Sequence, residues 1–293
     1  MQRNQSSSFY LGVDGGGSKC KAVVVNHNLE ILGSAIAGPA NPCVDYQLAI
    51  DSITESCGRA LAEAGLSKEQ HRIELGLALA GVNFDHVFQR VNEWSHPFHS
   101  MRLITDWHAA CLGAHEGRDG AVIIVGTGSC GYVCVNGQSK SFGGHGFPVG
   151  DKGSGAWLGL QAMKAALLAK DGMGPPTLMK ELLCTSLSCK PEDLAIRMVG
   201  ASSAQYAQLA KTVFAANKQG DVQAAGILNE AIDYIEAMAH SILEYGPPRL
   251  SLVGGIAPFL MPLLNHRLRE HISRPLANPE MGAVYSLLKN TKT

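Results

Sequence analysis

The stretch Leu11-Gly-Val-Asp-Gly-Gly-Gly-Ser-Lys-Cys-Lys-Ala-Val-Val-Val25 consists of an apolar run, a glycine-rich turn and a second apolar run. Three consecutive glycines adopt backbone conformations closed to other residues and let a ligand approach the main chain. Successive N–H groups in such a turn form a concave anion site, to which Ser18 adds a donor and Lys19 a positive charge. Asp14, at the end of the first strand, suits a hydrated Mg²⁺, which prefers one or two carboxylates plus phosphate oxygens. The stretch therefore predicts a β-hairpin that holds the phosphates of a metal-bound nucleotide.

Two other nucleotide-binding motifs fit this stretch less well. A dinucleotide-binding Rossmann turn needs G-x-G-x-x-G spacing with a helix directly after it, whereas Lys21-Ala-Val-Val-Val25 predicts a strand. A Walker loop needs Gly-Lys before Ser or Thr, and the chain contains no Gly-Lys dipeptide. A glycine-rich turn without a ligand is the alternative that this stretch alone leaves open.

A second copy of the pattern occurs in the middle of the chain. Ala121-Val-Ile-Ile-Val-Gly-Thr-Gly-Ser129 is again an apolar strand that runs into glycines and a hydroxyl. Tyr132-Val-Cys-Val135 predicts the returning strand, and the Asn136-Gly137 that follows is a strong hairpin signal. A later glycine pair, in Leu252-Val-Gly-Gly-Ile256, also ends an apolar strand and precedes helical sequence. The two glycine hairpins therefore indicate two related halves.

The composition indicates a two-domain globular protein of the cytoplasm. The 293 residues suffice for two ordinary domains, and the net charge of −1 gives no sign of nucleic acid or an anionic membrane as partner. The first ten residues lack the apolar core of a signal peptide, and no apolar run approaches membrane-spanning length. The eight cysteines are scattered without C-x-x-C spacing, so reduced thiols are expected. Because dimers are the commonest soluble assembly, a homodimer is expected.

Hydrophobic periodicity and turn residues divide the chain into strands and helices. Strands are expected within 9–25 and at 31–36, 74–80, 103–105, 121–125, 132–135 and 250–253. Helices are expected at 45–66, 87–96, 107–115, 156–170, 177–187, 191–199, 204–217, 221–245, 257–271 and 279–289.

Three regions outside the hairpins contain polar side chains that could take part in binding or catalysis. Asn41 lies between two prolines and is either a turn-forming residue or a donor and acceptor for a ligand hydroxyl. Asp106 follows a strand and opens a helix, so it is either an N-cap or a general base. The glycine-rich run from Phe142 to Trp157 leads directly into an apolar helix, and its chemically capable side chains are His145 and Asp151.

Two facing phosphate hairpins with a later Gly-Gly site resemble the actin-like ATPase and sugar-kinase superfamily. Four motifs together, Asp14-Gly-Gly-Gly-Ser18, Ile104-Thr-Asp106, Gly126-Thr-Gly-Ser129 and Gly143-Gly-His-Gly-Phe-Pro-Val-Gly-Asp-Lys-Gly-Ser154, are similar to the N-acetylglucosamine and glucosamine kinases among the BadF/BadG/BcrA/BcrD-type ATPases. The resemblance implies an α/β fold of two actin-like (ribonuclease H-like) domains, with mixed sheets flanked by helices and a cleft between them. The expected domains are residues 1–105, with the helix at 278–293 packed back on them, and residues 106–277.

The resemblance also implies roles for individual residues, with ATP and Mg²⁺ as cofactors. Asp106 is implied to accept the proton of the sugar 6-hydroxyl, and Asp14 to orient Mg²⁺. The residues implied to hold the sugar are Asn41, Asp106, Ser129, Gly144, His145 and Asp151. The residues implied to hold the phosphates and adenosine are Gly16, Gly17, Ser18, Lys19, Thr127, Gly128, Gly254 and Gly255.

Two departures from the N-acetylglucosamine kinase pattern bear on the substrate. Cys130 stands where that pattern has Asn, and His145 stands where it has Trp. Losing an amide partner and an apolar wall favours glucosamine over N-acetylglucosamine, because Asp151 or another carboxylate can accept the charge of a free amine. Lys152 stands where many relatives carry Glu, and the sequence gives no prediction for the effect of this change. The alternatives are an N-acetylglucosamine kinase, an activator ATPase with an iron–sulfur cluster, and a nucleotide-binding assembly protein without catalysis.

Overall fold

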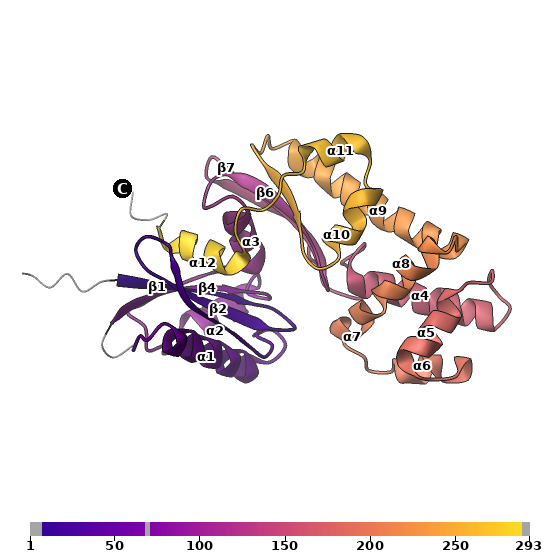
Figure 1. The fold of residues 1–293 in the computed structure, drawn as a ribbon, viewed down its shortest axis with the longest axis horizontal. Helices are drawn as coiled ribbons and strands as arrows, with labels where there is room; N and C mark the ends of the chain where they lie inside the picture. The colour runs from indigo at the N-terminus through magenta and orange to yellow at the C-terminus, as the bar shows by residue number, and fades with distance from the viewer. Residues whose placement is uncertain (1–7, 68–70, 289–293) are drawn as a thin grey trace, which may run out of the picture. The chain divides into compact units, whose positions relative to one another are not determined.

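The computed structural model describes residues 8–67 and 71–288, and the chain divides into two compact units. The first unit comprises residues 1–120 and 274–293, and the second comprises residues 121–273. Each unit is built on one β-sheet with helices packed on it (Figure 1). This confirms the predicted class of two mixed sheets flanked by helices. The predicted end of the last helix at 289 lies outside the described residues.

The first unit has a five-stranded sheet in the order β3-β2-β1-β4-β5. The strand β1 pairs antiparallel with β2 and parallel with β4, while β3 is antiparallel to β2 and β5 parallel to β4. The strands are β1 Ser8–Gly15, β2 Cys20–Val25, β3 Ile31–Ala37, β4 Arg72–Leu79 and β5 Ser100–Thr105. The helices are α1 Tyr46–Glu63, α2 Asp85–Asn92, α3 Asp106–Ala114 and α12 Pro279–Leu288.

Strand alternation gives this sheet two apolar faces, each covered by helices. Val24 packs with the α1 and α2 side, while Val23 and Val25 pack with Met281 and Val284 of α12. The helix α12 approaches closely because glycines face it. A side-chain carbon at Gly12 would overlap the Glu280 carbonyl, so no larger residue fits there.

The boundary between the units differs from the expected one. The helix α3 was expected to open the second domain, whereas it packs on α12 and β4 within the first unit (Figure 1). Gly282 of α12 lies against the Ala109 carbonyl of α3, and Gly113 lies against the Asn278 carbonyl. These backbone contacts place α3 with the first unit, which runs to Gly120 and resumes at Arg274.

The second unit has a four-stranded sheet in the order β8-β7-β6-β9, with β6 parallel to β9 and β7 antiparallel to β8. The strands are β6 Gly120–Val125, β7 Ser129–Val135, β8 Gln138–Gly143 and β9 Leu250–Val253. The helices are α4 Gly155–Lys170, α5 Met179–Leu187, α6 Leu194–Arg197, α7 Ser203–Gln208, α8 Ala210–Lys218, α9 Val222–Leu243, α10 Ala257–Leu260 and α11 His266–His271. Two 3₁₀ turns are η1 Pro191–Asp193 and η2 Met261–Leu263.

Three predicted helices are interrupted in the structure. The stretch 191–199 is a 3₁₀ turn followed by the four-residue α6, and 204–217 divides into α7 and α8 at Leu209. The stretch 257–271 breaks at η2, where Pro262 has no N–H to donate and Asn265 caps a new helix by accepting from the Leu268 N–H. The edge strand β8 was not predicted, because Gln138 to Ser141 are all polar.

The helices seen in residues 8–67 and 71–288 are all too short or too polar to cross a bilayer.

Candidate active site

The first glycine hairpin forms as predicted between β1 and β2. Asp14 pairs with Lys21 and Gly15 with Cys20 across the two strands, and the Gly16 N–H donates to the Lys19 carbonyl at 3.0 Å. At Gly16 and Gly17 a side-chain carbon would have no neighbour within 4 Å, so the main chain there faces open space. The turn therefore presents its backbone without any covering side chain, which is the geometry that an anion site requires.

Asp14 and Asp106 are neighbouring, partly buried carboxyls in the first unit. Asp14 lies near the end of β1, and Asp106 directly follows β5. Burial, together with the charges of Asp106 and Glu280, raises the pKa of Asp14 to about 7, although Lys19 and Lys21 act in the opposite direction. Two carboxyls that disfavour each other's ionisation form an acidic centre that a cation would stabilise.

Asp106 is the first residue of α3 and not its N-cap. The cap is Thr105, whose Oγ1 accepts from the His108 N–H at 3.4 Å, while Asp106 Oδ1 accepts from the Trp107 N–H at 2.9 Å. Burial raises the pKa of Asp106 to about 6, although the Trp107 N–H opposes that effect. Its own backbone N–H acts in the same direction as the Trp107 N–H.

Asn41 has the turn-forming contacts that the sequence left as one of two alternatives. Its Oδ1 accepts from the Cys43 N–H at 3.0 Å, and its carbonyl accepts from the N–H groups of Val44 and Asp45. The preceding Ala40 N–H donates to the Gly16 carbonyl at 2.8 Å, which ties this turn to the glycine hairpin. Asn41 can therefore offer a ligand its Nδ2 donor and the second lone pair of Oδ1.

The second hairpin connects β6 to β7 and is fastened to the start of α4. The carbonyls of Gly126 and Thr127 accept from the N–H groups of Gly155 and Ala156, at 2.8 and 3.2 Å. Ser154 caps α4 by accepting from the Trp157 N–H at 3.1 Å. Hairpin and helix therefore form one rigid corner of the second unit.

Asp151 joins this hairpin to the glycine-rich loop. It adopts φ +59°, and its Oδ1 accepts from the Gly146 N–H at 3.2 Å. A side-chain carbon at Gly128 would lie 2.6 Å from Asp151 Oδ2, so the carboxylate rests directly on the hairpin. Burial raises the pKa of Asp151, and N–H groups of Gly146 and Ser129 together with His145 oppose that shift.

The other predicted sugar-binding residues of the second unit lie at the start of β7 or in the glycine-rich loop, and they differ in which polar groups remain for a ligand. The Ser129 hydroxyl is buried and donates to the Lys152 carbonyl at 2.8 Å, so it holds the loop together. The Gly144 N–H is also used, because it donates to the Ser129 carbonyl at 3.1 Å. His145 is exposed. Lys152, whose role was open, pairs with Glu230 of α9 at 3.2 Å.

The late glycine pair follows β9. Gly254 has φ +105°, and a side-chain carbon there would overlap the Val125 carbonyl of β6. The Ile256 N–H donates to that same carbonyl at 3.0 Å. At Gly255 no atom lies within 4 Å of such a carbon, so the second glycine leaves an open surface beside the end of the sheet.

Two groups near these residues were missed in the sequence. Lys21 of β2 pairs with the buried Glu280 of α12 at 2.6 Å, which places an ion pair next to Asp14. Tyr234 of α9 reaches the glycine-rich loop of the second unit, where Asp151 and Cys130 influence its pKa. No local pattern marks either group, because each acts on residues far away in the sequence.

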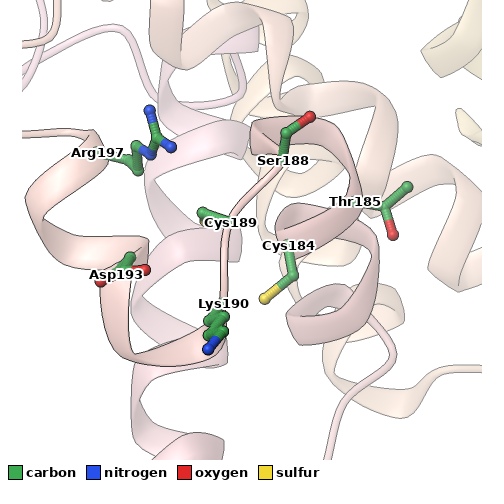
Figure 2. A pocket seen from close by; sticks show the side chains of 7 residues that line it. All are labelled: Cys184, Thr185, Ser188, Cys189, Lys190, Asp193 and Arg197. Atoms are coloured by element: carbon green, nitrogen blue, oxygen red, sulfur yellow. The ribbon is translucent and has the colours of Figure 1, made fainter.

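A pocket of about 560 Å³ opens elsewhere on the second unit, around the C-terminal end of α5 (Figure 2). None of the predicted site residues lines it; its lining residues are Cys184, Thr185, Ser188, Cys189, Lys190, Asp193 and Arg197.

The donor set of the first unit fits Mg²⁺. Mg²⁺ takes oxygen ligands and usually binds through one or two carboxylates, with water and phosphate oxygens completing the shell. The mutual repulsion of Asp14 and Asp106 is the electrostatic situation that a divalent cation relieves. Among the described residues no three His, Cys, Asp or Glu side chains form a group that could hold a metal ion.

Comparison with known proteins agrees with the motifs. Residues 11–284 match the BadF/BadG/BcrA/BcrD ATPase family. Glucosamine kinase GspK of Vibrio cholerae is 32% identical over 278 residues, covering 94% of this chain and 95% of that protein. The N-acetylmuramic acid/N-acetylglucosamine kinase of Clostridium acetobutylicum is 28% identical over 254 residues, covering 80% and 79%.

A solved structure extends the likeness to the fold. The protein is from Chromobacterium violaceum, and its assignment as an N-acetylglucosamine kinase is itself provisional. It superposes with a TM-score of 0.89 at 26% identity, over 97% of this chain and 99% of that one. From the match along nearly its whole length, the chain belongs to the BadF/BadG/BcrA/BcrD ATPase family.

Proposed function

We propose that this protein transfers the γ-phosphoryl group of ATP to the 6-hydroxyl of an amino sugar, giving ADP and the sugar 6-phosphate. The observation that carries the proposal is the pair of partly buried carboxyls, Asp14 and Asp106, beside an open glycine hairpin. The family and the kinases among the relatives support it.

In this proposal Asp106 is the general base. A base works best when its pKa lies near the operating pH, and burial raises the pKa of Asp106 to about 6. Its Oδ1 is fixed by the Trp107 N–H, so the carboxylate is oriented before the substrate binds. The carboxylate then accepts the proton of the attacking hydroxyl.

Asp14 and the first hairpin hold the metal-bound phosphates. Asp14 would coordinate Mg²⁺ directly or through water, and the bound ion supplies positive charge against the transferring phosphoryl group. The N–H group of Gly17, with Ser18 and Lys19, binds phosphate oxygens, while Gly16 lets the phosphates approach the main chain and its own N–H donates to the Lys19 carbonyl. Phosphoryl transfer depends mainly on this positioning and charge stabilisation.

The second unit supplies the remaining contacts in the proposal. Thr127 and Gly128 hold phosphates, and Gly254 and Gly255 accommodate the adenosine. Asn41 of the first unit donates through Nδ2 to a sugar hydroxyl. The loop residues Gly144, His145 and Asp151 surround the sugar, whereas we assign Ser129 to holding the loop, since its hydroxyl already donates to Lys152.

We propose glucosamine, with its free amine, as the preferred sugar. Asp151 offers a carboxylate oxygen for a charged amine, and the exposed His145 gives no apolar wall for an acetyl group. The named relatives include kinases for both the free and the acetylated amino sugar. The cytoplasmic location and the homodimer expected from the sequence stay predictions.

The test is ADP release from Mg-ATP with glucosamine, N-acetylglucosamine, glucose or no sugar. Strong stimulation by glucosamine, together with a product that co-elutes with glucosamine 6-phosphate, supports the proposal. Stimulation by N-acetylglucosamine instead keeps the mechanism and overturns the substrate. Absence of stimulation by every sugar overturns the kinase assignment.

A further inference from the structure

The hydroxyl of Tyr234 lies on the glycine-rich loop of the second unit. Tyr234 belongs to α9, and a side-chain carbon at Gly143 would come within 2.8 Å of its Oη. Gly143 pairs with Cys130 across β7 and β8, so the hydroxyl sits above this strand pair at the start of the loop. The φ of Gly143 is +66°, and this value together with the Tyr234 contact requires glycine at position 143.

Two chemically active side chains share this position. The charges of Asp151 and Cys130 both act on Tyr234, which places the carboxylate, the thiol and the phenol in one neighbourhood. Burial first, and then these two groups, raise the pKa of Tyr234, so it is a neutral phenol at physiological pH. A neutral phenol can both donate one hydrogen bond and accept another.

The Tyr234 hydroxyl has no hydrogen bond to any residue in 8–67 or 71–288, although its side chain is partly buried. Tyrosine hydroxyls that leave water usually find a partner, so a half-buried one directed at a loop is available to a ligand. Asp151 lies in the same loop: its Oδ1 accepts from the Gly146 N–H, its Oδ2 lies over Gly128, and the Ser129 N–H also acts on the carboxylate. A carboxylate has about four lone-pair sites, so it can accept a further donor from a ligand.

We propose that Tyr234 and Asp151 form the subsite that recognises the free 2-amino group of the sugar. This inference rests on the proposed kinase function and adds a specificity-determining residue to it. An ammonium has three N–H donors and a positive charge, which match one carboxylate oxygen and one phenol oxygen. An N-acetyl group has one N–H, no charge and a bulky carbonyl and methyl, so it leaves Asp151 without its counter-charge.

The expected loss of kcat/KM follows from the type of hydrogen bond that the Tyr234 hydroxyl would make to the ammonium group. A hydrogen bond to a charged group contributes more than one between neutral groups. Removing only the Tyr234 hydroxyl should therefore lower kcat/KM for glucosamine by about 10-fold, chiefly through KM, since the contact exists before and during transfer. For glucose and N-acetylglucosamine, which carry no charge at this position, the change should stay below about threefold.

The experiment measures kcat and KM of Tyr234→Phe and the parent protein with glucosamine, glucose and N-acetylglucosamine at saturating Mg-ATP. Tyr245→Phe is the matched control, because its ring contacts Phe142 at 6.0 Å near the same strand but it lies beyond the end of α9. Thermal unfolding of each variant, and calorimetric titration with glucosamine alone, separate loss of binding from loss of fold.

A loss confined to glucosamine in Tyr234→Phe, with Tyr245→Phe unchanged, supports the subsite. An equal loss for all three sugars, or no loss, overturns it while leaving the kinase assignment intact. Failure of the parent protein to phosphorylate any sugar is a different result, which overturns the kinase proposal itself. If Tyr234→Phe unfolds, Tyr234→Leu replaces it, because leucine also lacks the hydroxyl: unchanged glucosamine affinity in that variant overturns the inference, and a glucosamine-specific loss supports it.

Discussion

Asp106 is not needed to cap α3, because the preceding Thr105 is the N-cap. The Thr105 Oγ1 accepts from the His108 N–H, so the helix does not depend on the Asp106 carboxylate for its cap. The residue can therefore be changed with little effect on helix stability, and its contribution to catalysis can be measured separately.

Asp106→Asn is expected to keep its fold and nucleotide binding while losing about 10²- to 10⁴-fold in sugar-dependent ADP formation, the range typical of a general base. Steady-state kinetics and a nucleotide-binding titration measure the two properties. Asp85→Asn is the matched control, because Asp85 is likewise the first residue of a helix but is exposed. Near-normal turnover of Asp106→Asn would show that another group is the base.

Asp14 is a residue whose ionisation opposes folding. Its pKa is about 7 in the folded protein and 3.8 as an unperturbed carboxyl, so the folded state binds more protons between these values. Stability therefore falls as the pH rises from about 4 to about 7, and the full penalty is present above that window.

Asp14→Asn should raise the free energy of unfolding at pH 8 without Mg²⁺, on the order of 1–3 kcal/mol, and the gain should shrink as the pH approaches 4. Urea denaturation across this range measures it. Asp221→Asn should do the opposite at neutral pH: burial acts to raise the pKa of Asp221, but hydrogen bonds from Ala224, Leu178 and Thr177 outweigh it and hold the pKa low. A loss of stability in Asp14→Asn at pH 8 would contradict this account.

At the scale of elements, the two adjacent glycines after β9, Gly254 and Gly255, differ in the space around them. Gly254 is confined by φ +105° and by the Val125 carbonyl, whereas Gly255 faces open space. The first glycine is needed for β9 to pass beside β6, and the second leaves room for a ligand.

Gly254→Ala should lower the free energy of unfolding by about 2 kcal/mol or more, because an Ala at this φ is strained and meets backbone. Gly255→Ala, the adjacent control, should change it by less than about 0.5 kcal/mol while raising KM for ATP. Urea denaturation and steady-state kinetics measure both. Equal stability losses in the two variants would show that this turn does not distinguish its glycines.

At the scale of the whole molecule, the last helix completes the first unit. Glu280 of α12 is buried and pairs with Lys21 of β2, while Gly12 and Gly282 allow backbone contact with β1 and α3. Breaking this buried pair from one side leaves a charge without its partner, which costs more than the pair itself contributes.

Glu280→Gln and Lys21→Met are each expected to destabilise the protein by on the order of 1–3 kcal/mol, and the double variant by less than the sum. A double-mutant cycle in urea measures the coupling. The exposed pair Glu55–Arg59 is the control, since both side chains are more than half exposed and a change of under 1 kcal/mol is expected. Additive losses at Lys21 and Glu280 would rule out the coupling.

The sequence by itself determined the features that depend on neighbouring residues. The hairpins around Asp14 and Gly126, the pair Asn136-Gly137 and the strand before Asp106 follow from apolar runs and glycine turns, which act over a few residues. The family followed from the order of those motifs along the chain.

Only the tertiary structure decided features that depend on distant segments. In the folded protein α3 packs on α12, and the Ser129 hydroxyl donates to the Lys152 carbonyl. Tyr234 lies near Asp151, and Glu280 pairs with Lys21. The physical reason is that hydrogen bonds, burial and charge interactions act through distances in space, and local sequence patterns do not contain those distances.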